Sequence, residues 1–220
     1  MITNTRSSNS LGQFITFEGG EGVGKSTNIE YCRQLLEQKG LEVIVTREPG
    51  GTEIAEIIRE QLLKKPHKER MSDITELLLV FAARAQHVDA LVKPALERGC
   101  WVLCDRFTDS TIAYQGYGRG LAVTLIEQLK LIAQQGIEPQ KTFLLDAPVD
   151  IGMSRARARG PADRFEVEQL DFFNRVREGF LAIAEKSPDR VQLVNAAQTL
   201  EQVQADLKKA IEQLLATEES

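Results

Sequence analysis

A phosphate-binding motif lies near the start of the chain. Residues 19–27 fit the pattern Gly, four residues, Gly-Lys-Ser/Thr, and they directly follow an apolar run. Glycines let the backbone turn its N–H groups toward a phosphate, and the helix that leaves the loop adds the positive end of its dipole. Lys25 can then reach the β- and γ-phosphates of a nucleotide, and Ser26 can bind the Mg²⁺ between them. The residues of this motif are Gly19, Gly20, Glu21, Gly22, Val23, Gly24, Lys25, Ser26 and Thr27.

A second candidate site follows the apolar run at residues 100–104. Asp105 ends this run as in a Walker B element and would hold Mg²⁺, directly or through water, opposite Ser26. Arg106 comes next, where a guanidinium can grip a second phosphate and neutralise charge that builds up during phosphoryl transfer. Many strands end in Asp, and a surface ion pair is the alternative for Arg106. The phosphate loop upstream favours the catalytic interpretation of both residues.

Five apolar runs of strand length are separated by segments with helical spacing. Continuous apolar runs are typical of strands buried on both faces, so a parallel sheet is predicted, with helices on both faces. The phosphate loop and Asp105 would then meet at the carboxyl edge of the sheet, where ligands bind. Residues 105–120 are assigned no helix. Strands are expected at 14–17, 41–46, 100–104, 142–145 and 191–194, and helices at 25–39, 54–63, 72–98, 123–134, 150–158, 167–185 and 200–215.

Composition limits the class of protein. The 220 residues are 42% hydrophobic, enough for one sizeable domain, here expected at residues 13–220. A net charge of −5 and the lack of a long basic run argue against a nucleic-acid partner. No apolar stretch approaches the length of a membrane span, so no membrane partner and a cytoplasmic location are expected. Residues 1–12 are rich in Ser, Thr and Asn and lack the apolar core of a signal peptide, so they are predicted to be a disordered tail.

Four separated segments resemble bacterial thymidylate kinases, in the order in which that family has them. The resemblance covers residues from about 13 to 215. It implies the three-layer α/β fold of P-loop nucleoside monophosphate kinases, a five-stranded parallel sheet flanked by helices, with a mobile lid at about 155–165. The segments are Arg47-Glu48-Pro49-Gly50-Gly51-Thr52, Phe81-Ala82-Ala83-Arg84, Asp105-Arg106-Phe107 leading to Ser110-Thr111-Ile112-Ala113-Tyr114-Gln115-Gly116, and Arg155-Ala156-Arg157-Ala158-Arg159-Gly160.

The resemblance also implies an activity. The γ-phosphate of MgATP would be transferred to dTMP, giving dTDP and ADP in dTTP biosynthesis, by a homodimer that pairs through the long helix at 72–98. Residues 19–27 and Arg155 would then bind ATP. Arg59 and Arg106 would hold the dTMP phosphate, and Tyr114 would favour deoxyribose. The residues implied to bind dTMP are Glu48, Pro49, Arg59, Phe81, Arg84, Arg106, Ser110, Thr111, Tyr114 and Gln115, of which Arg84 and Gln115 would face the thymine edge.

Two positions need comment against the family pattern. Family members commonly carry a stacking aromatic four residues before the base-reading arginine, and this chain has Val80 there. Phe81 either takes over the stacking or packs in the core. The phosphate loop also has no arginine, which implies that the lid supplies the one that stabilises the transferring group, with Arg159 as first candidate and Arg155 next. The implied catalytic residues are Lys25, Arg106, Arg159 and Glu18, with Glu18 near the sugar and metal, and the implied metal ligands are Ser26 and Asp105.

Three alternatives stay open at this point. The first is a kinase for another nucleoside or nucleotide, against which Arg84, Tyr114 and Gln115 argue. The second is a P-loop regulatory switch or GTPase, although the chain has no Asn-Lys-x-Asp sequence of the kind that reads guanine. The third is a P-loop scaffold without activity, which the intact phosphate loop, Asp105 and Arg106 disfavour.

Overall fold

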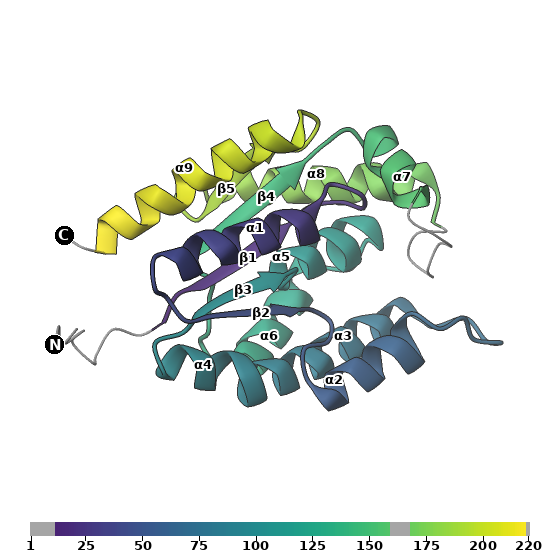
Figure 1. Ribbon diagram of the computed structural model, residues 1–220. Helices are drawn as coiled ribbons and strands as arrows, with labels where there is room; N and C mark the ends of the chain where they lie inside the picture. The colour runs from purple at the N-terminus through teal and green to yellow at the C-terminus, as the bar shows by residue number, and fades with distance from the viewer. Residues whose placement is uncertain (1–11, 159–167, 219–220) are drawn as a thin grey trace, which may run out of the picture.

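Five parallel strands form the sheet at the centre of the computed structural model, which describes residues 12–158 and 168–218. The strand order is β2-β3-β1-β4-β5, and every neighbouring pair is parallel. Because β1 lies in the middle, the loop that follows it leaves the sheet at its centre (Figure 1). The predicted α/β fold with a five-stranded parallel sheet is confirmed. The strands are β1 (Phe14–Glu18), β2 (Val43–Arg47), β3 (Trp101–Asp105), β4 (Lys141–Asp146) and β5 (Val191–Asn195).

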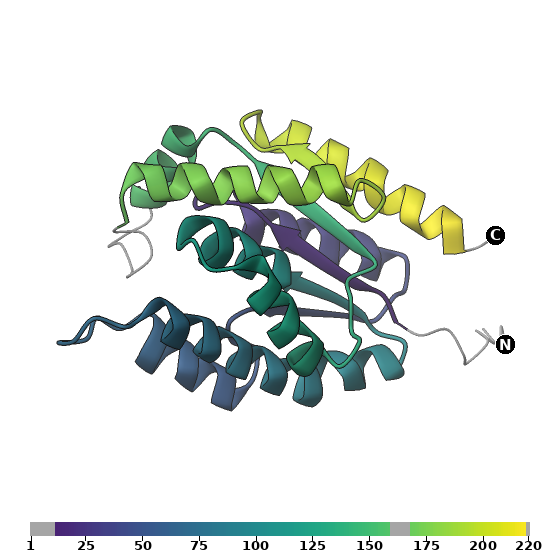
Figure 2. The same cartoon turned by 180° about the vertical axis from the view of Figure 1, so that it is seen from behind.

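Helices cover both faces of this sheet. On the face toward the viewer in Figure 1 lie α1 (Lys25–Gln38) and α9 (Leu200–Glu218). Figure 2 shows the opposite face, which α8 (Leu170–Lys186) and the helical segment after β3 cover. The remaining helical segments, in which η marks a π-helix, are α2 (Glu53–Ile57), η1 (Ile58–Leu63), α3 (Asp73–His87), η2 (Val88–Val92), α4 (Lys93–Glu97), α5 (Thr108–Thr111), η3 (Ile112–Gly118), α6 (Val123–Gln134) and α7 (Val149–Arg157).

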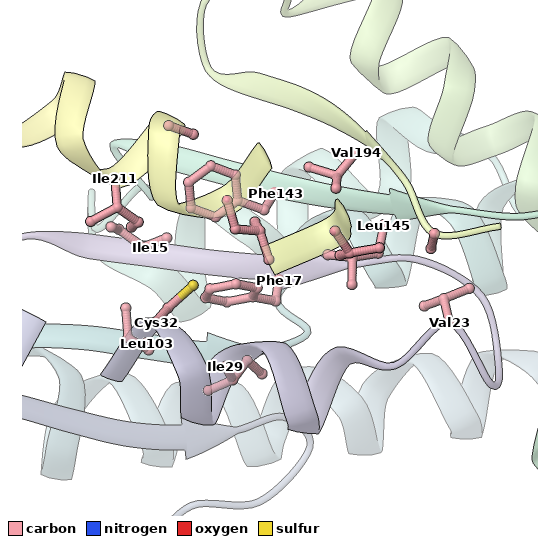
Figure 3. Close-up of a cluster of buried hydrophobic side chains, with 14 of the residues drawn as sticks. Ile15, Phe17, Val23, Ile29, Cys32, Leu103, Phe143, Leu145, Val194 and Ile211 are labelled. Carbon is pink, nitrogen blue, oxygen red and sulfur yellow. The ribbon is translucent and has the colours of Figure 1, made fainter. Parts of the chain in front are cut away.

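Successive residues of β1 enter different hydrophobic clusters. Ile15 and Phe17 pack with Cys32 of α1 and Ile211 of α9 (Figure 3). Phe14 packs on the other side with residues of η2, α4 and β3. Side chains alternate across a strand, so a strand with helices on both faces needs apolar residues at consecutive positions. This explains why the strands could be found as continuous apolar runs.

Most predicted elements are confirmed with boundaries shifted by one or two residues. The long helix expected at 72–98 is present as three consecutive segments, α3, η2 and α4. Residues 1–11 and 159–167, which include Arg159, most of the predicted tail and most of the predicted lid, lie outside the described residues. Gly12 is buried, and its N–H donates to the Leu96 carbonyl at 2.8 Å. Within the described part of the chain, no helix has the length and apolar character needed to cross a lipid bilayer.

No helix was predicted within residues 105–120, and this prediction was wrong, because α5 and η3 occupy 108–118. This segment carries several glycines and polar residues, which weaken any helical pattern. Its helical form depends on packing against α8. A Cβ on Gly118 would lie 2.6 Å from the Phe172 ring, and a Cβ on Gly179 would lie 2.8 Å from the Tyr117 ring. Glycines therefore let η3 and α8 approach closely, and this contact replaces the missing local propensity.

Candidate active site

The loop between β1 and α1 has the backbone geometry of a phosphate loop. Gly22 and Gly24 adopt positive φ angles of 69° and 86°. The Lys25 side chain is buried, and its Nζ donates to the carbonyls of Gly19 and Gly20 at 3.3 and 3.1 Å, across the concave side of the loop. Burial, and next the charge of Arg106, lower the pKa of Lys25. A polyanion held in the loop would therefore stabilise the charged ammonium.

This loop packs directly on α7. A Cβ on Gly22 would lie 1.9 Å from the carbonyl oxygen of Gly152. A Cβ on Gly152 would lie 2.4 Å from the carbonyl oxygen of Glu21. The two backbones can approach to this distance only because both positions are glycine.

A cavity of about 780 Å³ opens beside the loop. Its walls include Lys25 and Ser26 from the loop and Asp105 and Arg106 from the end of β3. Asp105 Oδ1 lies 4.0 Å from Lys25 Nζ and, although buried, has no hydrogen-bond partner among the described residues. The structure thus brings together the residues predicted to bind phosphate and Mg²⁺. Glu21, Gly22, Val23 and Gly24 also line this cavity, whereas Gly19, Gly20, Thr27 and Arg155 do not.

Arg155 is held at a different place. It lies on α7, and its Nη1 donates to the carbonyl of Ala196, just after β5, at 2.8 Å. Its predicted contact with ATP stays a prediction. The first candidate for the arginine of the lid, Arg159, lies outside the described residues.

A second, narrower cavity of about 130 Å³ lies on the other side of Arg106. Four side chains, Glu21, Arg59, Lys64 and Arg106, line both cavities. Two anionic ligands bound in the two cavities would therefore meet at Arg106. From the predicted dTMP-binding set, the narrow cavity is lined by Glu48, Pro49, Arg59, Arg84, Arg106, Ser110, Thr111, Tyr114 and Gln115.

Arg106 is held tightly at this junction. Its φ is +69°, a left-handed conformation that is unfavourable for an arginine. One guanidinium nitrogen donates to the Gly19 carbonyl at 2.8 Å and to Ser110 Oγ at 3.1 Å. The other donates to the Glu21 carboxylate at 2.7 Å and to the Tyr114 hydroxyl at 3.1 Å. Glu21 was predicted only as part of the phosphate loop. In the structure its carboxylate binds the Arg106 guanidinium, which is expected to hold a phosphate.

Arg84 is almost completely buried, with 1% of its surface exposed. Its Nε donates to Glu48 at 2.7 Å and its Nη2 to Thr111 Oγ1 at 2.9 Å. His87 supports Glu48 from behind, since Nδ1 lies 2.9 Å from the other carboxylate oxygen and Nε2 lies 2.8 Å from Thr46 Oγ1. Arg84 Nη1 has no partner among the described residues. Arg84 lines the narrow cavity, and Nη1 is a buried donor that lacks an acceptor in the described part of the chain.

Phe81 does not line the narrow cavity, whereas Val80 does. The Phe81 ring is 4% exposed, packs with Leu77 and Ile126 in a core cluster, and lies 4.8 Å from the Arg84 guanidinium carbon. Consecutive residues of a helix point about 100° apart, so a ring one position along from Val80 cannot take its place. The assignment of Phe81 to dTMP binding is corrected accordingly, and core packing is the alternative that holds.

Glu18 is also placed differently from its predicted role beside the sugar and metal. Its carboxylate is buried, lines neither cavity, and accepts hydrogen bonds from the Phe107 N–H at 2.7 Å and from Ser110 Oγ at 2.5 Å. Glu18 therefore supports the turn that carries Arg106 and is a positioning residue. Burial and the neighbouring charge of Asp109 raise its pKa to about 7.

This raised pKa predicts a dependence of stability on pH. The folded state holds the proton of Glu18 more tightly than the unfolded state, where the pKa is 4.5, so its contribution is fully present below pH 4.5 and is lost as the pH rises through 7. Urea unfolding of the wild type and of Glu18→Gln at pH 5 to 8 should show the wild type losing up to roughly 3 kcal/mol relative to the variant. A difference that stays constant with pH would contradict this account of Glu18.

With this geometry in place, similarity to known proteins decides the family. The family model of thymidylate kinase matches residues 17–207. The chain belongs to the thymidylate kinase family. A thymidylate kinase from Pseudomonas fluorescens is 57% identical over 204 residues, covering 93% of this chain and 97% of the relative, and one from Teredinibacter turnerae is 53% identical, covering 93% and 99%. The crystal structure of thymidylate kinase from Ehrlichia chaffeensis has a TM-score of 0.73 and 36% identity, covering 91% of this chain and 98% of that one.

Lys64 is among the cavity residues of this thymidylate kinase family member that were not anticipated from sequence. Lys64 lines both cavities together with Arg59. The two residues are five positions apart across η1, and the Lys64 N–H donates to the Arg59 carbonyl at 2.9 Å. A π-helix brings residues i and i+5 close, whereas a search for a 3.6-residue period separates them. Periodicity therefore held no signal for Lys64.

Proposed function

We propose that this chain transfers the γ-phosphoryl group of ATP to dTMP, with the ATP phosphates in the wide cavity and dTMP in the narrow one. The observation that carries this assignment is the position of Arg106, which lines both cavities. A guanidinium at such a junction can contact the acceptor phosphate and the transferring group together.

On the ATP side, the loop amides and Lys25 hold the β- and γ-phosphates. Asp105 and Ser26 fit a Mg²⁺ site, since both line the wide cavity and Asp105 Oδ1 is a buried oxygen without a hydrogen-bond donor among the described residues. In the same part of the chain, no group of three or more His, Cys, Asp or Glu could hold a metal alone. This suits Mg²⁺, which takes few protein ligands beside phosphate oxygens. When bound, the ion would neutralise charge on the phosphates.

On the dTMP side, Arg59 and Arg106 receive the phosphate, and Arg84 and Gln115 receive the base. Arg59 is positioned by a 2.8 Å hydrogen bond from Nη1 to the Pro49 carbonyl. The dTMP phosphate is already a competent nucleophile near neutral pH, so the chain does not need a strong general base. Its contribution is to hold the two phosphates in line and to surround them with positive charge. The arginine of the lid, assigned to Arg159, would add to that charge.

The test is a substrate panel. ADP should form from ATP only when dTMP is added, and dTDP should appear in equal amount. Formation of a different diphosphate, with none from dTMP, would assign the chain to another monophosphate. Thermal stabilisation by GTP, but by neither ATP nor dTMP, would indicate a GTP-binding switch instead. The cytoplasm, expected from sequence, supplies the ATP that such an enzyme needs.

We further propose that exposed apolar side chains of α3 and α6 pack against a second copy of this chain. These helices pack on one another, and Ile74 and Leu78 on α3 and Ile132 on α6 are among their exposed large apolar residues. Ile74 and Leu78 are four residues apart and share one side of α3. An exposed apolar stripe beside a buried cluster is typical of an oligomer interface, which supports a homodimer through the long helix.

Light scattering should therefore give a mass twice the 24.5 kDa of the chain. Leu78→Glu should shift the protein toward the monomer, because a carboxylate would be buried against an apolar surface. Leu200→Glu, which changes an exposed residue at the start of α9, is the matched control and should leave the mass unchanged. A monomeric wild type at micromolar concentration would refute the dimer.

A further inference from the structure

A buried carboxylate contacts the side chain that is expected to meet the thymine base. Glu76 of α3 and Gln115 of η3 are 2% and 3% exposed. Gln115 Nε2 donates to Glu76 Oε1 at 2.9 Å. Glu76 lines neither the narrow nor the wide cavity, so it acts on a ligand only through Gln115.

This contact decides which way the Gln115 amide points. An amide carries a donor and an acceptor that are nearly equal in shape, so it can turn over unless a neighbour distinguishes them. An ionised carboxylate only accepts hydrogen bonds and therefore selects the NH₂ group. Gln115 lines the narrow cavity, and its Oε1 receives no hydrogen bond from the described residues. The oxygen is thus left to accept a hydrogen bond from a ligand.

Arg119 keeps Glu76 in the state that makes this selection. Its Nε and Nη2 lie 3.3 Å from the two carboxylate oxygens of Glu76. The Arg119 guanidinium also lies 4.7 Å from the Phe172 ring centre, which fixes its plane. A guanidinium paired in this way favours the ionised carboxylate, because it stabilises the negative charge.

Arg84 presents the opposite group in the same cavity. Its buried Nη1 is a donor for which no described residue provides an acceptor. A donor and an acceptor from the lining of one cavity match the imide edge of thymine or uracil, where O4 accepts and N3–H donates. Cytosine has the reverse arrangement, with a donating amino group and an accepting N3. The amino group of cytosine would face the Arg84 donor, and its N3 would face the Gln115 acceptor. Neither pair can form a hydrogen bond, so buried polar atoms would stay unpaired.

We propose that Glu76 is a positioning residue that sets pyrimidine specificity by holding the Gln115 amide with its oxygen toward the base. This inference rests on the proposed function, which places thymine in the narrow cavity. It assigns Glu76 a role in discrimination between bases and none in the transfer of phosphate.

The test replaces Glu76 with Gln and measures kcat/KM for dTMP, dUMP and dCMP. A glutamine at this position can donate as well as accept, so the Gln115 amide is free to turn over. We expect kcat/KM for dTMP to fall about tenfold and the dTMP:dCMP ratio to fall at least as much. The dTMP:dUMP ratio should stay within about twofold, because the two bases share the imide edge. An unchanged dTMP:dCMP ratio would overturn the proposal, as would equal falls in both ratios.

Two further variants separate this proposal from its neighbours. Arg119→Lys keeps a positive charge beside Glu76 but loses the forked contact, so its melting temperature should fall while the dTMP:dCMP ratio stays. Gln115→Met removes the amide and should lower kcat/KM for dTMP with or without Glu76→Gln. If Gln115→Met leaves kcat/KM for dTMP unchanged, thymine does not lie in this cavity, and the proposed binding of dTMP in the narrow cavity is wrong. If it lowers activity while Glu76→Gln leaves the base ratio intact, only the role of Glu76 fails.

Discussion

Replacing Arg106 by Ala should lower kcat/KM for dTMP on the order of 10³-fold. Among the members of the predicted catalytic set that the structure describes, Arg106 alone lines both cavities, and its guanidinium is held by Gly19, Ser110, Glu21 and Tyr114. Its removal takes a fixed positive charge from the point where negative charge accumulates. Steady-state assays that follow dTDP check this.

Matched variants show whether the rate depends on the two parallel contacts of the Arg106 guanidinium or only on its positive charge. Arg106→Lys keeps the charge and should recover only part of the rate, since an ammonium cannot make the two parallel contacts of a guanidinium. Arg33→Ala removes a half-buried surface arginine of α1 that pairs with Glu30 and Glu37, and should keep the wild-type rate. A rate for Arg106→Ala within a factor of two of wild type would remove Arg106 from the site.

Lys25→Met should reduce kcat by about 10²- to 10³-fold. Methionine fills a similar volume without the charge, so the loop can keep its shape while the γ-phosphate loses a partner. Because burial opposes the charge of Lys25 in the folded state, the variant should unfold at a temperature no lower than the wild type. Assays of dTDP formation and thermal melts measure the two effects.

Lys208→Met is the control for this substitution, since Lys208 is an exposed residue of α9 that pairs with Glu212. It should change neither rate nor melting temperature. A Lys25→Met protein that is inactive because it no longer folds would contradict the account given for the buried ammonium.

The strands and the ligand edge could be predicted because their signals are local. Each strand contains a short apolar run, the phosphate loop follows β1, and Asp105 is the last residue of β3. The parallel order then forces those segments together at one edge of the sheet. For the same reason, Lys25, Ser26, Asp105 and Arg106 could be predicted to lie together, and all four line the wide cavity.

The parts that could not be predicted depend on contacts between distant residues. The helix at 108–118 is held by its packing on α8, far along the chain. Glu18 was assigned to the substrate side, but the last residue of β1 points toward α5, as its contact with Ser110 shows. Glu76 and His87 lie on a helix with a clear apolar pattern, and their partners come from other elements. Nothing in their neighbouring residues marks either of them as polar support for the cavity.

The close approach of Gly22 and Gly152 has a consequence for how this chain can vary. Gly152 lies 130 positions beyond Gly22, yet a methyl group at either place would strike the backbone of the other segment. A mutant library that randomised only the phosphate loop would leave residue 152 unchanged and miss this coupling. Designed or naturally occurring sequences therefore have to keep residues 22 and 152 small at the same time. The steric limits of the nucleotide site thus include a position on α7, a helix that carries none of the phosphate-loop motif.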